Sequence, residues 1–383
     1  MSNALPIVII GTGLAGYSLA REFRKLNDTQ PILMLTRDDG HSYSKPMLST
    51  GFTKGKSADA LSMADPGRMA AQLNISIRNF TEVTGIDPDA KQLSIGSETL
   101  AYEKLVLANG AAVNTLNFPG SEHENILSIN DLMDYRVFRQ KLDEKQRVLI
   151  MGAGLIGCEY ANDLLNGDYQ VTVVDPSKTA LNGLIPGFAG QALIQGIERA
   201  GAEFRMQRFV KEVVDQGTHL LAILDDGSKV ETDLIISAVG LKPDLNLAKS
   251  AGLGCQRGIM VNRYLETSQT DIYALGDCAE IDGHVLLYVL PLMTSARALA
   301  KTLNGERSQV SFAAMPVATK TPACPVVVCP PLAENGVWQI EQDGMNIKAC
   351  YVDAENEVLG FVLTGDCIAA KQSLAKQVKG IHL

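Results

Sequence analysis

The chain repeats one pattern of hydrophobic and polar positions: a short apolar run, a glycine-rich stretch and a segment with helical periodicity. The first copy is LPIVIIGTGLAG at 5–16, followed by YSLAREFRKL. The second is RVLIMGAGLIG at 147–157, followed by CEYANDLL. An apolar run without alternation predicts a strand buried on both faces of a parallel sheet. The chain is therefore predicted to be an α/β protein with two Rossmann-like units.

The glycine spacing of the first copy is that of a dinucleotide-binding loop. Gly11 permits the tight turn, Gly13 lets the backbone approach a pyrophosphate, and Gly16 allows close packing of the helix. The amides and the positive end of the helix dipole then face the phosphates. We expect the whole loop to contact a dinucleotide: Gly11, Thr12, Gly13, Leu14, Ala15 and Gly16. The alternative is a glycine-rich turn without a ligand.

The second copy predicts a second dinucleotide. Gly152, Gly154 and Gly157 have the same spacing, and the next apolar strand ends at Asp175. A carboxylate at this point accepts a hydrogen bond from the ribose 2'-hydroxyl and repels a 2'-phosphate. The second unit is therefore expected to bind NAD rather than NADP.

The first unit departs from this pattern at its second strand. The strand PILMLTR ends on Thr36 and Arg37, where no carboxylate stands. We expect these two residues to lie at the cofactor. The usual ribose contact is left open: Asp38 or Asp39 could substitute for the missing acid, or the hydroxyl of Thr36 could serve.

A third motif, TSQTDIYALGDCAE at 267–280, brings Gly276 and Asp277 to the end of another apolar strand. The carboxyl edge of a parallel sheet is where such proteins bind ligands. Asp277 could accept a ribityl hydroxyl of a flavin, while Gly276 lets that chain come close. The alternative is a helix N-cap, since aspartate is common there.

Two further residues are candidate contacts of the first cofactor. Lys45 lies in SYSKPMLSTGF at 42–52, just after the second strand, where a loop would return over the cofactor. A cation beside the isoalloxazine ring stabilises the anionic reduced flavin, although an exposed surface lysine is an equal alternative. The segment around Val83 is predicted to be a parallel strand whose backbone could meet an adenine.

Composition narrows the class of protein. A chain of 383 residues is expected to form two or three domains. The formal net charge of -9 argues against a general nucleic-acid or anionic-membrane partner. The seven cysteines have scattered spacing, which is unlike a disulfide framework or a metal site. No long apolar run or signal peptide is evident, so the cytoplasm is expected.

Together these motifs resemble the pyridine-nucleotide:disulfide oxidoreductase superfamily, which has the glutathione-reductase-like fold. Within that superfamily the chain is similar to the bacterial rubredoxin:NAD reductases that feed alkane hydroxylases. The stretches that carry this resemblance are YSKPMLSTGF, GLIGCEYANDL, YALGDCAE, LPLMTSARALA and MPVATKTPACPVVV.

The resemblance implies that the second unit is inserted into the first, and that a small α+β domain covers the flavin. It places FAD in the first unit and NADH in the second. The implied limits are 1–112 and 242–315 for the FAD-binding domain, 113–241 for the NAD-binding domain, and 316–383 for the C-terminal domain.

The resemblance also implies roles for single residues. Lys45, Val83, Asp277 and Lys320 fall on FAD-contacting positions, and Glu159 falls near both the nicotinamide and the flavin. Lys45 and Glu159 are thereby expected to pair near the flavin N5 as the catalytic residues. Glu159 could instead be a first-turn acid that complements the helix dipole.

The cysteine pairs of the disulfide reductases are missing from this chain. The expected acceptor is therefore a one-electron protein, rubredoxin, with the flavin doing the chemistry. The alternatives are a ferredoxin, a rubredoxin-like domain of a nitric oxide reductase, or a flavin redox sensor without turnover. TKTPACP stands where ferredoxin reductases carry a tryptophan segment, which favours rubredoxin. A cationic docking surface, or simply a solvated basic tail, is expected at Arg297, Lys301, Lys320, Lys371, Lys376 and Lys379.

Overall fold

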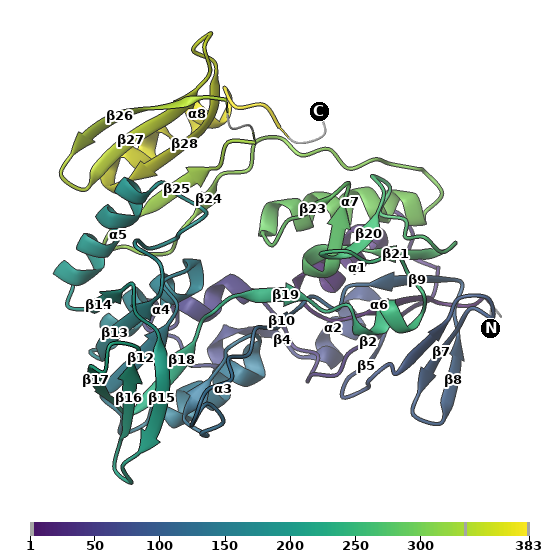
Figure 1. The fold of residues 1–383 in the computed structure, drawn as a ribbon. Helices are drawn as coiled ribbons and strands as arrows, with labels where there is room; N and C mark the ends of the chain where they lie inside the picture. Colours follow the sequence, from purple (N-terminus) through teal and green to yellow (C-terminus); the bar gives the residue numbers. More distant parts are fainter. Residues whose placement is uncertain (1–3, 333–334, 381–383) are drawn as a thin grey trace.

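The computed structural model describes residues 4–332 and 335–380. Two five-stranded parallel sheets and one five-stranded antiparallel sheet organise the chain (Figure 1). The α/β prediction with two Rossmann-like units and a small C-terminal domain is confirmed. Among the helices in the described part of the chain, none has the length and apolar character needed to cross a membrane.

The first parallel sheet lies in what we call the first unit. Its central strand β1 runs beside β2 and β9, so that Ile9 lies between Met34 and Val106. These side chains are almost fully buried, which explains the absence of alternation in the sequence. The strands in spatial order are β21 (Ile272–Ala274), β9 (Lys104–Leu107), β1 (Ile7–Ile10), β2 (Ile32–Leu35) and β5 (Ser76–Arg78).

Helices cover the first sheet. The glycine-loop helix α1 packs against α7, which follows the second unit in the sequence, and Figure 1 shows the two helices close together. The edge strand β21 joins this sheet only after the chain has built the second unit. The helices of the first unit are α1 (Leu14–Arg24), α2 (Pro66–Leu73), α6 (Asn246–Ser250) and α7 (Val289–Leu303), with 3-10 turns η1 (Lys45–Thr50), η2 (Asp59–Leu61) and η3 (Gly276–Cys278).

The second unit repeats the arrangement. Its glycine loop follows the central strand β12, which pairs in parallel with β13 and β18. The strands in spatial order are β11 (Ile126–Leu127), β18 (Leu234–Ser237), β12 (Arg147–Met151), β13 (Gln170–Asp175) and β14 (Glu203–Met206). The helices are α3 (Leu132–Lys141), α4 (Leu155–Leu165) and α5 (Gly187–Arg199).

Two crossing strands connect the units. The chain leaves the first unit through β10 (Ala111–Val113) and returns through β19 (Leu241–Pro243), and these strands pair antiparallel. Figure 1 shows them between the two sheets. The second unit is thus inserted between β9 and β21 of the first sheet. The exact domain limits at 112 and 242 stay a prediction.

Small sheets extend both units, and one of them corrects an expectation. The predicted parallel strand around Val83 is wrong: Val83 lies in an extended loop between β5 and β6. The parallel sheet already ends at its edge strand β5, and β6, which follows Val83, belongs to a separate sheet where it pairs antiparallel with β7. The small strands are β3 (Ser42–Tyr43), β4 (Ser62–Ala64), β6 (Gly85–Asp87), β7 (Gln92–Ile95), β8 (Glu98–Ala101), β15 (Val210–Asp215), β16 (Leu220–Leu224), β17 (Lys229–Thr232), β20 (Ile259–Val261), β22 (Ala279–Ile281) and β23 (His284–Val285).

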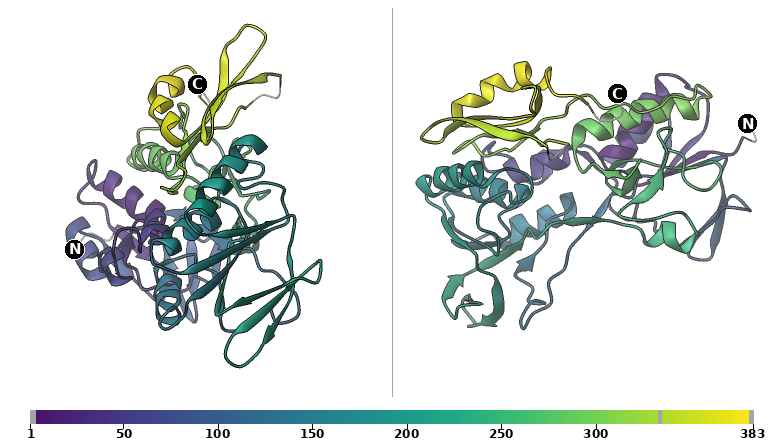
Figure 2. Two further views of the ribbon diagram at one scale, coloured as in Figure 1. Left: turned by 90° about the vertical axis from the view of Figure 1, so that its left-hand side faces the viewer. Right: turned by 45° about the horizontal axis from the view of Figure 1, so that its top comes forward.

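The C-terminal unit rests on the second unit. Its strand β28 contacts α5, and Figures 1 and 2 show its sheet over that helix. Buried Val326 and Ile347 share one hydrophobic core with α4 and α5. The strands in spatial order are β24 (Val317–Ala318), β25 (Val326–Cys329), β28 (Val358–Thr364), β27 (Asn346–Val352) and β26 (Val337–Asp343), followed by η4 (Gly365–Ala370) and α8 (Lys371–Ala375).

Candidate functional site

One cavity of about 1840 Å³ runs between the two units and the C-terminal unit. It collects the carboxyl ends of strands from both parallel sheets, which is where nucleotides bind in this class of fold. Most predicted site residues line it. The three that do not are Gly16, Gly157 and Gly276.

The first glycine loop has the geometry of a close backbone cradle. A Cβ at Gly11 would lie 2.3 Å from the carbonyl oxygen of Ala108, and one at Gly16 would lie 2.0 Å from that of Gly11. Gly13 has nothing within 4 Å. The outer two glycines therefore pack the helix on the strand, while Gly13 leaves space on the cavity side. This explains why Gly16 lies beneath the cavity wall and not in it.

The second glycine loop repeats these contacts. A Cβ at Gly152 would lie 2.5 Å from the oxygen of Ala238, and one at Gly157 would lie 1.9 Å from the oxygen of Gly152. Gly154 again faces open space. The two loops thus offer the same kind of surface to two ligands in one cavity.

Asp38 places a carboxylate at the cavity wall just after the end of β2. Its Oδ1 accepts hydrogen bonds from Thr36 Oγ1 at 2.7 Å and from Thr12 Oγ1 at 3.1 Å. Asp39 lies outside the cavity wall and pairs with Arg136. Arg37 lines the cavity, is 63% exposed at its side chain and lies 3.5 Å from Asp244. Among the alternatives left by the sequence, the geometry favours Asp38.

Two backbone N–H groups hold the carboxylate of Asp175 at the end of β13. Its Oδ2 accepts from the backbone N–H of Ala153 in the glycine loop at 2.7 Å, and its Oδ1 accepts from that of Ser177 at 2.7 Å. Phe209 lies on the same stretch of wall, since Arg208 N–H donates to the oxygen of Asp175. Phe209 is 52% exposed, although it is aromatic. An open aromatic face beside a fixed carboxylate suits an adenosine.

Lys45 meets a partner that the sequence did not suggest. Its Nζ donates to Asn130 Oδ1 at 2.7 Å. Burial lowers the pKa of Lys45, and the carboxylate of Asp277 opposes that shift. Burial likewise raises the pKa of Asp277, with Lys45 opposing. Lys45 and Asp277 thus face the same end of the cavity.

Glu159 is fully buried on the second turn of α4. It accepts from Ser49 Oγ at 2.7 Å and from the backbone N–H of Lys320 at 3.0 Å, and it forms an ion pair with Lys320 Nζ. The expected Lys45 and Glu159 pair is therefore wrong in this structure. The reason is that the C-terminal unit brings its own cation to Glu159, while Lys45 is turned toward Asn130.

The cationic residues expected at a docking surface separate into groups. Lys320 points into the cavity and onto Glu159, so its expected place on a docking surface is wrong. Lys301 pairs with Glu306, and Lys379 pairs with Glu357. The remaining three are Arg297, Lys371 and Lys376. Exposed pairs contribute little to stability, and each lowers the local positive charge.

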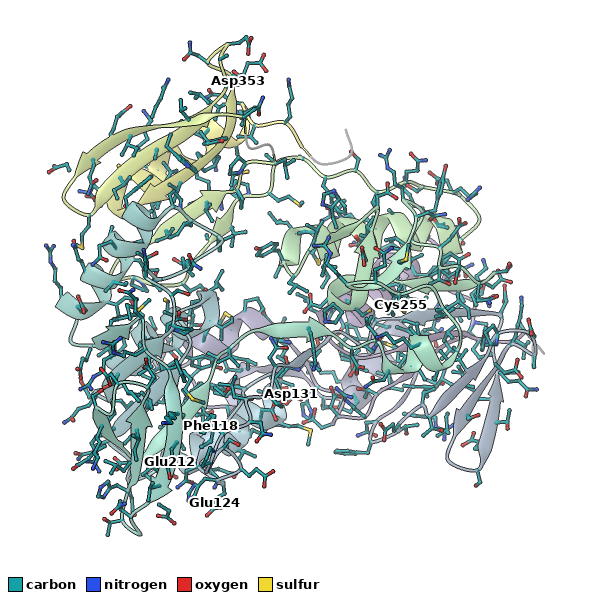
Figure 3. All side chains as sticks on the ribbon, viewed as in Figure 1. Phe118, Glu124, Asp131, Glu212, Cys255 and Asp353 are labelled. Atoms are coloured by element: carbon teal, nitrogen blue, oxygen red, sulfur yellow. The ribbon has the colours of Figure 1, made fainter. Side chains whose placement is uncertain are left out.

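None of the seven cysteines, all of them in the described part of the chain, lines the cavity. Cys158 follows the second glycine loop, but burial raises its pKa far above the usual range, which keeps the thiol protonated. Cys278 follows Asp277, and burial raises its pKa to about 12. Cys255 lies within the first unit (Figure 3). These thiols are therefore unsuited to taking electrons from the site.

Sequence reasoning missed three residues of the site: Asn109, Asn130 and Phe209. Asn109 follows β9, and its buried Oδ1 has no hydrogen-bond partner among the described residues. Its place directly after the apolar run KLVLA at 104–108 is a local signal for a residue at the carboxyl edge of the sheet. Asn130 and Phe209 lie in loops without a local motif.

Comparisons with known proteins agree with this geometry. Residues 5–307 match the family model "Pyridine nucleotide-disulphide oxidoreductase", and residues 309–378 match "Rubredoxin binding C-terminal domain". The chain is 49% identical to a rubredoxin-NAD(+) reductase of Alcanivorax borkumensis over 98% of this chain and 99% of that protein. It is 35% identical to a nitric oxide reductase FlRd-NAD(+) reductase of Vibrio vulnificus, over 97% of this chain and 98% of that protein.

A solved structure adds the fold. The crystal structure of a ferredoxin reductase from Rhodopseudomonas palustris superposes with a TM-score of 0.87 at 23% identity, covering 98% of this chain and 95% of that chain. The two glycine loops, their shared cavity and the family match over 5–307 lead to one conclusion. The chain belongs to the pyridine nucleotide-disulphide oxidoreductase family and ends in a rubredoxin-binding C-terminal domain.

Proposed function

We propose that the protein is an NADH-dependent flavoprotein reductase that passes electrons from NADH through FAD to rubredoxin. The observation that carries the proposal is the single cavity onto which both glycine loops open. The match of 309–378 to a rubredoxin-binding domain supports the choice of acceptor. So does the resemblance to the rubredoxin-NAD(+) reductase of Alcanivorax borkumensis.

The residues of the first unit fit FAD. Gly13 leaves open space at the start of α1, where a pyrophosphate would meet free amides. The buried Oδ1 of Asn109 lacks a donor among the described residues, and a buried acceptor without a partner is costly. A ribityl or amide donor of the cofactor would satisfy it. Asp38, Lys45, Val83, Asp277 and Lys320 would complete the site.

The residues of the second unit fit NADH. Gly154 leaves open space at the start of α4 for a pyrophosphate. Asp175 would accept from the adenosine ribose and repel a 2'-phosphate. Phe209 would offer its exposed face to the adenine.

FAD held by the residues of the first unit would supply the redox chemistry, which is hydride acceptance from the nicotinamide and single-electron transfer to the acceptor. The protein residues hold the site in place around that chemistry. Glu159 ties the loop at Ser49 to Lys320 of the C-terminal unit, which closes the cavity wall at the junction of three units. Lys45 brings a half-buried positive charge to the first unit's end of the cavity. The buried Cys158 thiol stays out of the electron path.

Purified, FAD-loaded protein tests this function. We expect NADH oxidation to be strongly accelerated by oxidised rubredoxin, followed at the visible bands of rubredoxin, with NADPH a poor substitute. Wild-type protein without rubredoxin is the control for slow oxidation by oxygen. Equal rates with and without rubredoxin would overturn the proposal and favour a redox sensor.

We further propose that the electrons supply an alkane hydroxylase. The motifs shared with reductases of that pathway support this. Deletion of the gene in its host should stop growth on n-alkanes and leave growth on the corresponding fatty acids intact. Unchanged growth on alkanes would contradict it. Loss of nitric oxide reduction instead would favour a rubredoxin-like domain as acceptor, which the resemblance to the Vibrio vulnificus protein supports.

A further inference from the structure

Asn130 joins three elements at the first unit's end of the cavity. Its Oδ1 accepts from Lys45 Nζ at 2.7 Å, and its Nδ2 donates to the carbonyl oxygen of Ala111 in β10 at 2.9 Å. Its own N–H donates to Asp134 Oδ2 at the start of α3 at 2.9 Å. The side chain belongs to the second unit, whereas Lys45 belongs to the first. Asn130 is therefore a hydrogen-bonded bridge between them.

The network fixes the orientation of the Asn130 amide. A carbonyl oxygen can only accept, so the amide nitrogen must face Ala111. An ammonium group can only donate, so the amide oxygen must face Lys45. Rotating the amide by 180° would break both bonds at once. Asn130 thus holds Nζ at one point of the cavity wall.

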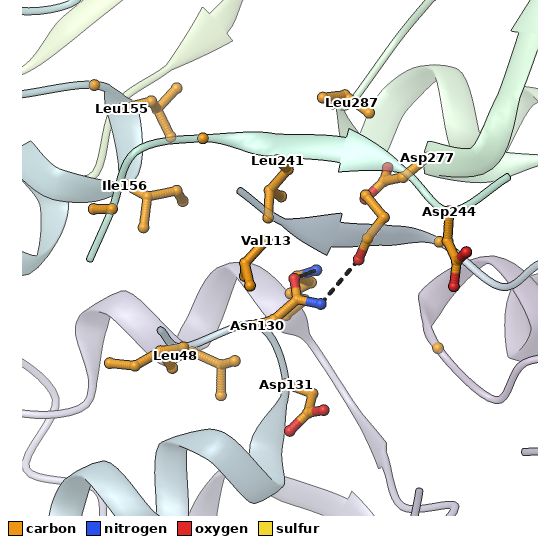
Figure 4. Close-up of a pocket in the computed structure, with 18 of the residues that line it drawn as sticks. Leu48, Val113, Asn130, Asp131, Leu155, Ile156, Leu241, Asp244, Asp277 and Leu287 are labelled. Atoms are coloured by element: carbon orange, nitrogen blue, oxygen red, sulfur yellow. Dashed lines mark hydrogen bonds between the residues drawn. The ribbon is translucent and has the colours of Figure 1, made fainter. Parts of the chain in front are cut away.

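The partner of Lys45 is neutral although acids lie nearby. Asp131 and Asp134, both near the start of α3, act on the lysine charge together with Asp277, and Figure 4 shows Asp131 and Asp277 around the bridge. The first two are engaged by backbone donors: Asp131 Oδ1 accepts from the N–H of Asp134 at 2.8 Å, and Asp134 accepts from that of Asn130. Figure 3 places Asp131 at the junction of the two units. The direct contact of the ammonium group is therefore an amide that cancels none of its charge.

We propose that Asn130 is a positioning residue that fixes Lys45 Nζ in the flavin site while leaving its charge uncompensated. This inference rests on the proposed function, because it assumes FAD in the first unit. Two-electron reduction brings negative charge to bound FAD, and a fixed, unneutralised cation stabilises that charge. Without Asn130, the Lys45 side chain can turn to Asp131 or Asp277, and an ion pair with that carboxylate then neutralises its charge.

The midpoint potential of bound FAD tests the proposal in the full-length, FAD-loaded protein. Photochemical reduction against a reference dye needs neither NADH nor rubredoxin. Asn130→Ala changes no charge, so any shift must act through the position of other groups. We expect it to weaken binding of reduced relative to oxidised FAD about threefold, a fall of about 15 mV for a two-electron couple. Lys45→Met should weaken it about tenfold, or about 30 mV.

A double-mutant cycle separates positioning from general loosening. In the Lys45→Met background, Asn130→Ala should shift the potential no further, because its target is gone. Asn130→Ser is a second variant, since its hydroxyl is too short to reach Nζ, and it should match Asn130→Ala. The matched control is Gln372→Glu, an exposed change on α8 that should leave the potential unchanged.

Three results would overturn the proposal. The first is an unchanged potential in both Asn130 variants with FAD bound. The second is an equal fall in the presence and absence of Lys45. The third is a wild-type protein that binds no FAD, which would also overturn the proposed function. The expected shifts of the potential and the expected result of the cycle, in a protein that fails to reduce rubredoxin, would instead refute the acceptor and leave the role of Asn130 intact.

Discussion

The two nucleotide units share a backbone cradle and differ in what the following helix buries. In both, the first and third glycines pack against backbone oxygens and the middle glycine faces open space. Two residues after the third glycine, α1 carries Ser18, which donates to the sulfur of Met293. At the same place α4 carries Glu159, which binds Ser49 and Lys320.

The difference continues along α4. Asn162 accepts from the N–H of Ala323 at 2.9 Å, and Asp163 accepts from Thr53 Oγ1 at 2.7 Å. The second helix therefore connects the loop after Lys45 to the C-terminal unit, while the main contacts of α1 are with α2, α7 and β3 of the first unit. The two glycine loops have the same backbone contacts. The helices that follow them differ in their polar side chains, and those of α4 join the three units.

The largest effect should come from breaking one cradle at a time. Gly16→Ala and Gly157→Ala each drive a Cβ into a backbone oxygen, which we expect to cost at least about 3 kcal/mol locally. Gly16→Ala should lose FAD. Gly157→Ala should retain FAD and lose its reduction by NADH.

FAD content by absorbance and reduction by NADH measure these effects. Gly13→Ala and Gly154→Ala are matched controls, since their Cβ atoms meet no protein atom within 4 Å. They should fold normally and weaken only dinucleotide binding. Loss of FAD from Gly157→Ala as complete as that from Gly16→Ala would contradict independent cradles.

The next largest effect concerns the contacts by which Glu159 on α4 joins the first unit to the C-terminal unit. Lys320→Met leaves the carboxylate of Glu159 buried without its cation. We expect a loss of about 2 to 3 kcal/mol in the free energy of unfolding, less than for a fully enclosed pair because the lysine side chain is 30% exposed. Lys320→Met with Glu159→Gln should recover much of it. Ser18→Ala on α1 is the comparison and should cost less than about 1 kcal/mol.

Denaturant unfolding of these variants gives the free energies. If the ion pair of Glu159 and Lys320 joins α4 to the C-terminal unit, the double-mutant cycle should show strong coupling between these two residues. Additive losses in that cycle would contradict it.

A third difference is electrostatic. Asp233 and Glu103 occupy matching positions in the two units. The backbone N–H of Asp233 donates to the carbonyl oxygen of Arg147, the first residue of the central strand β12. The backbone N–H of Glu103 donates to that of Pro6, the residue before the central strand β1. Burial of Asp233 raises its pKa, but Arg147 outweighs burial with side-chain and backbone hydrogen bonds and holds the pKa at about 2. Because this folded pKa is depressed, the stabilisation is present above the unfolded pKa near 4 and is lost as the pH falls toward 2.

Asp233→Asn should therefore lower the free energy of unfolding by about 2 kcal/mol at pH 7 and by much less near pH 2.5. Glu103→Gln, which loses only a contact with Gln30, should change it little at either pH. Thermal unfolding across this range measures both. An equal loss at the two pH values for Asp233→Asn would exclude the ion pair as its cause.

The smallest expected effect distinguishes the two carboxylates of the cradles. Asp175→Ala should reduce the preference for NADH over NADPH about tenfold, since the repulsion of a 2'-phosphate is removed. Asp38→Ala should weaken FAD binding and leave that preference unchanged. The ratio of kcat/KM for the two coenzymes measures the effect. A preference that survives Asp175→Ala would place nucleotide selection elsewhere.

The cradles could be predicted from the sequence because their determinants are local. A buried strand, the glycine spacing and the following helix all lie within about 20 residues, and the spacing dictates the backbone. Asp277 could be found in the same way, from the strand that precedes it. The family resemblance added Glu159 and Lys320 as site residues.

The partners of the site residues could not be predicted. Lys45 and Asn130 are 85 positions apart, and Glu159 and Lys320 are 161 apart. Which cation reaches Glu159 depends on how the C-terminal unit sits on α4 and α5. The missing acid after Thr36 is a milder case: only the turn that folds Asp38 back onto Thr12 shows which neighbour serves.

The most direct test of the whole account is the choice of acceptor. FAD-loaded protein would be reduced with NADH and mixed by stopped flow with rubredoxin or, separately, with a two-iron ferredoxin at equal ionic strength. We predict fast reoxidation by rubredoxin alone. Faster reoxidation by ferredoxin, or none by either protein, would contradict it.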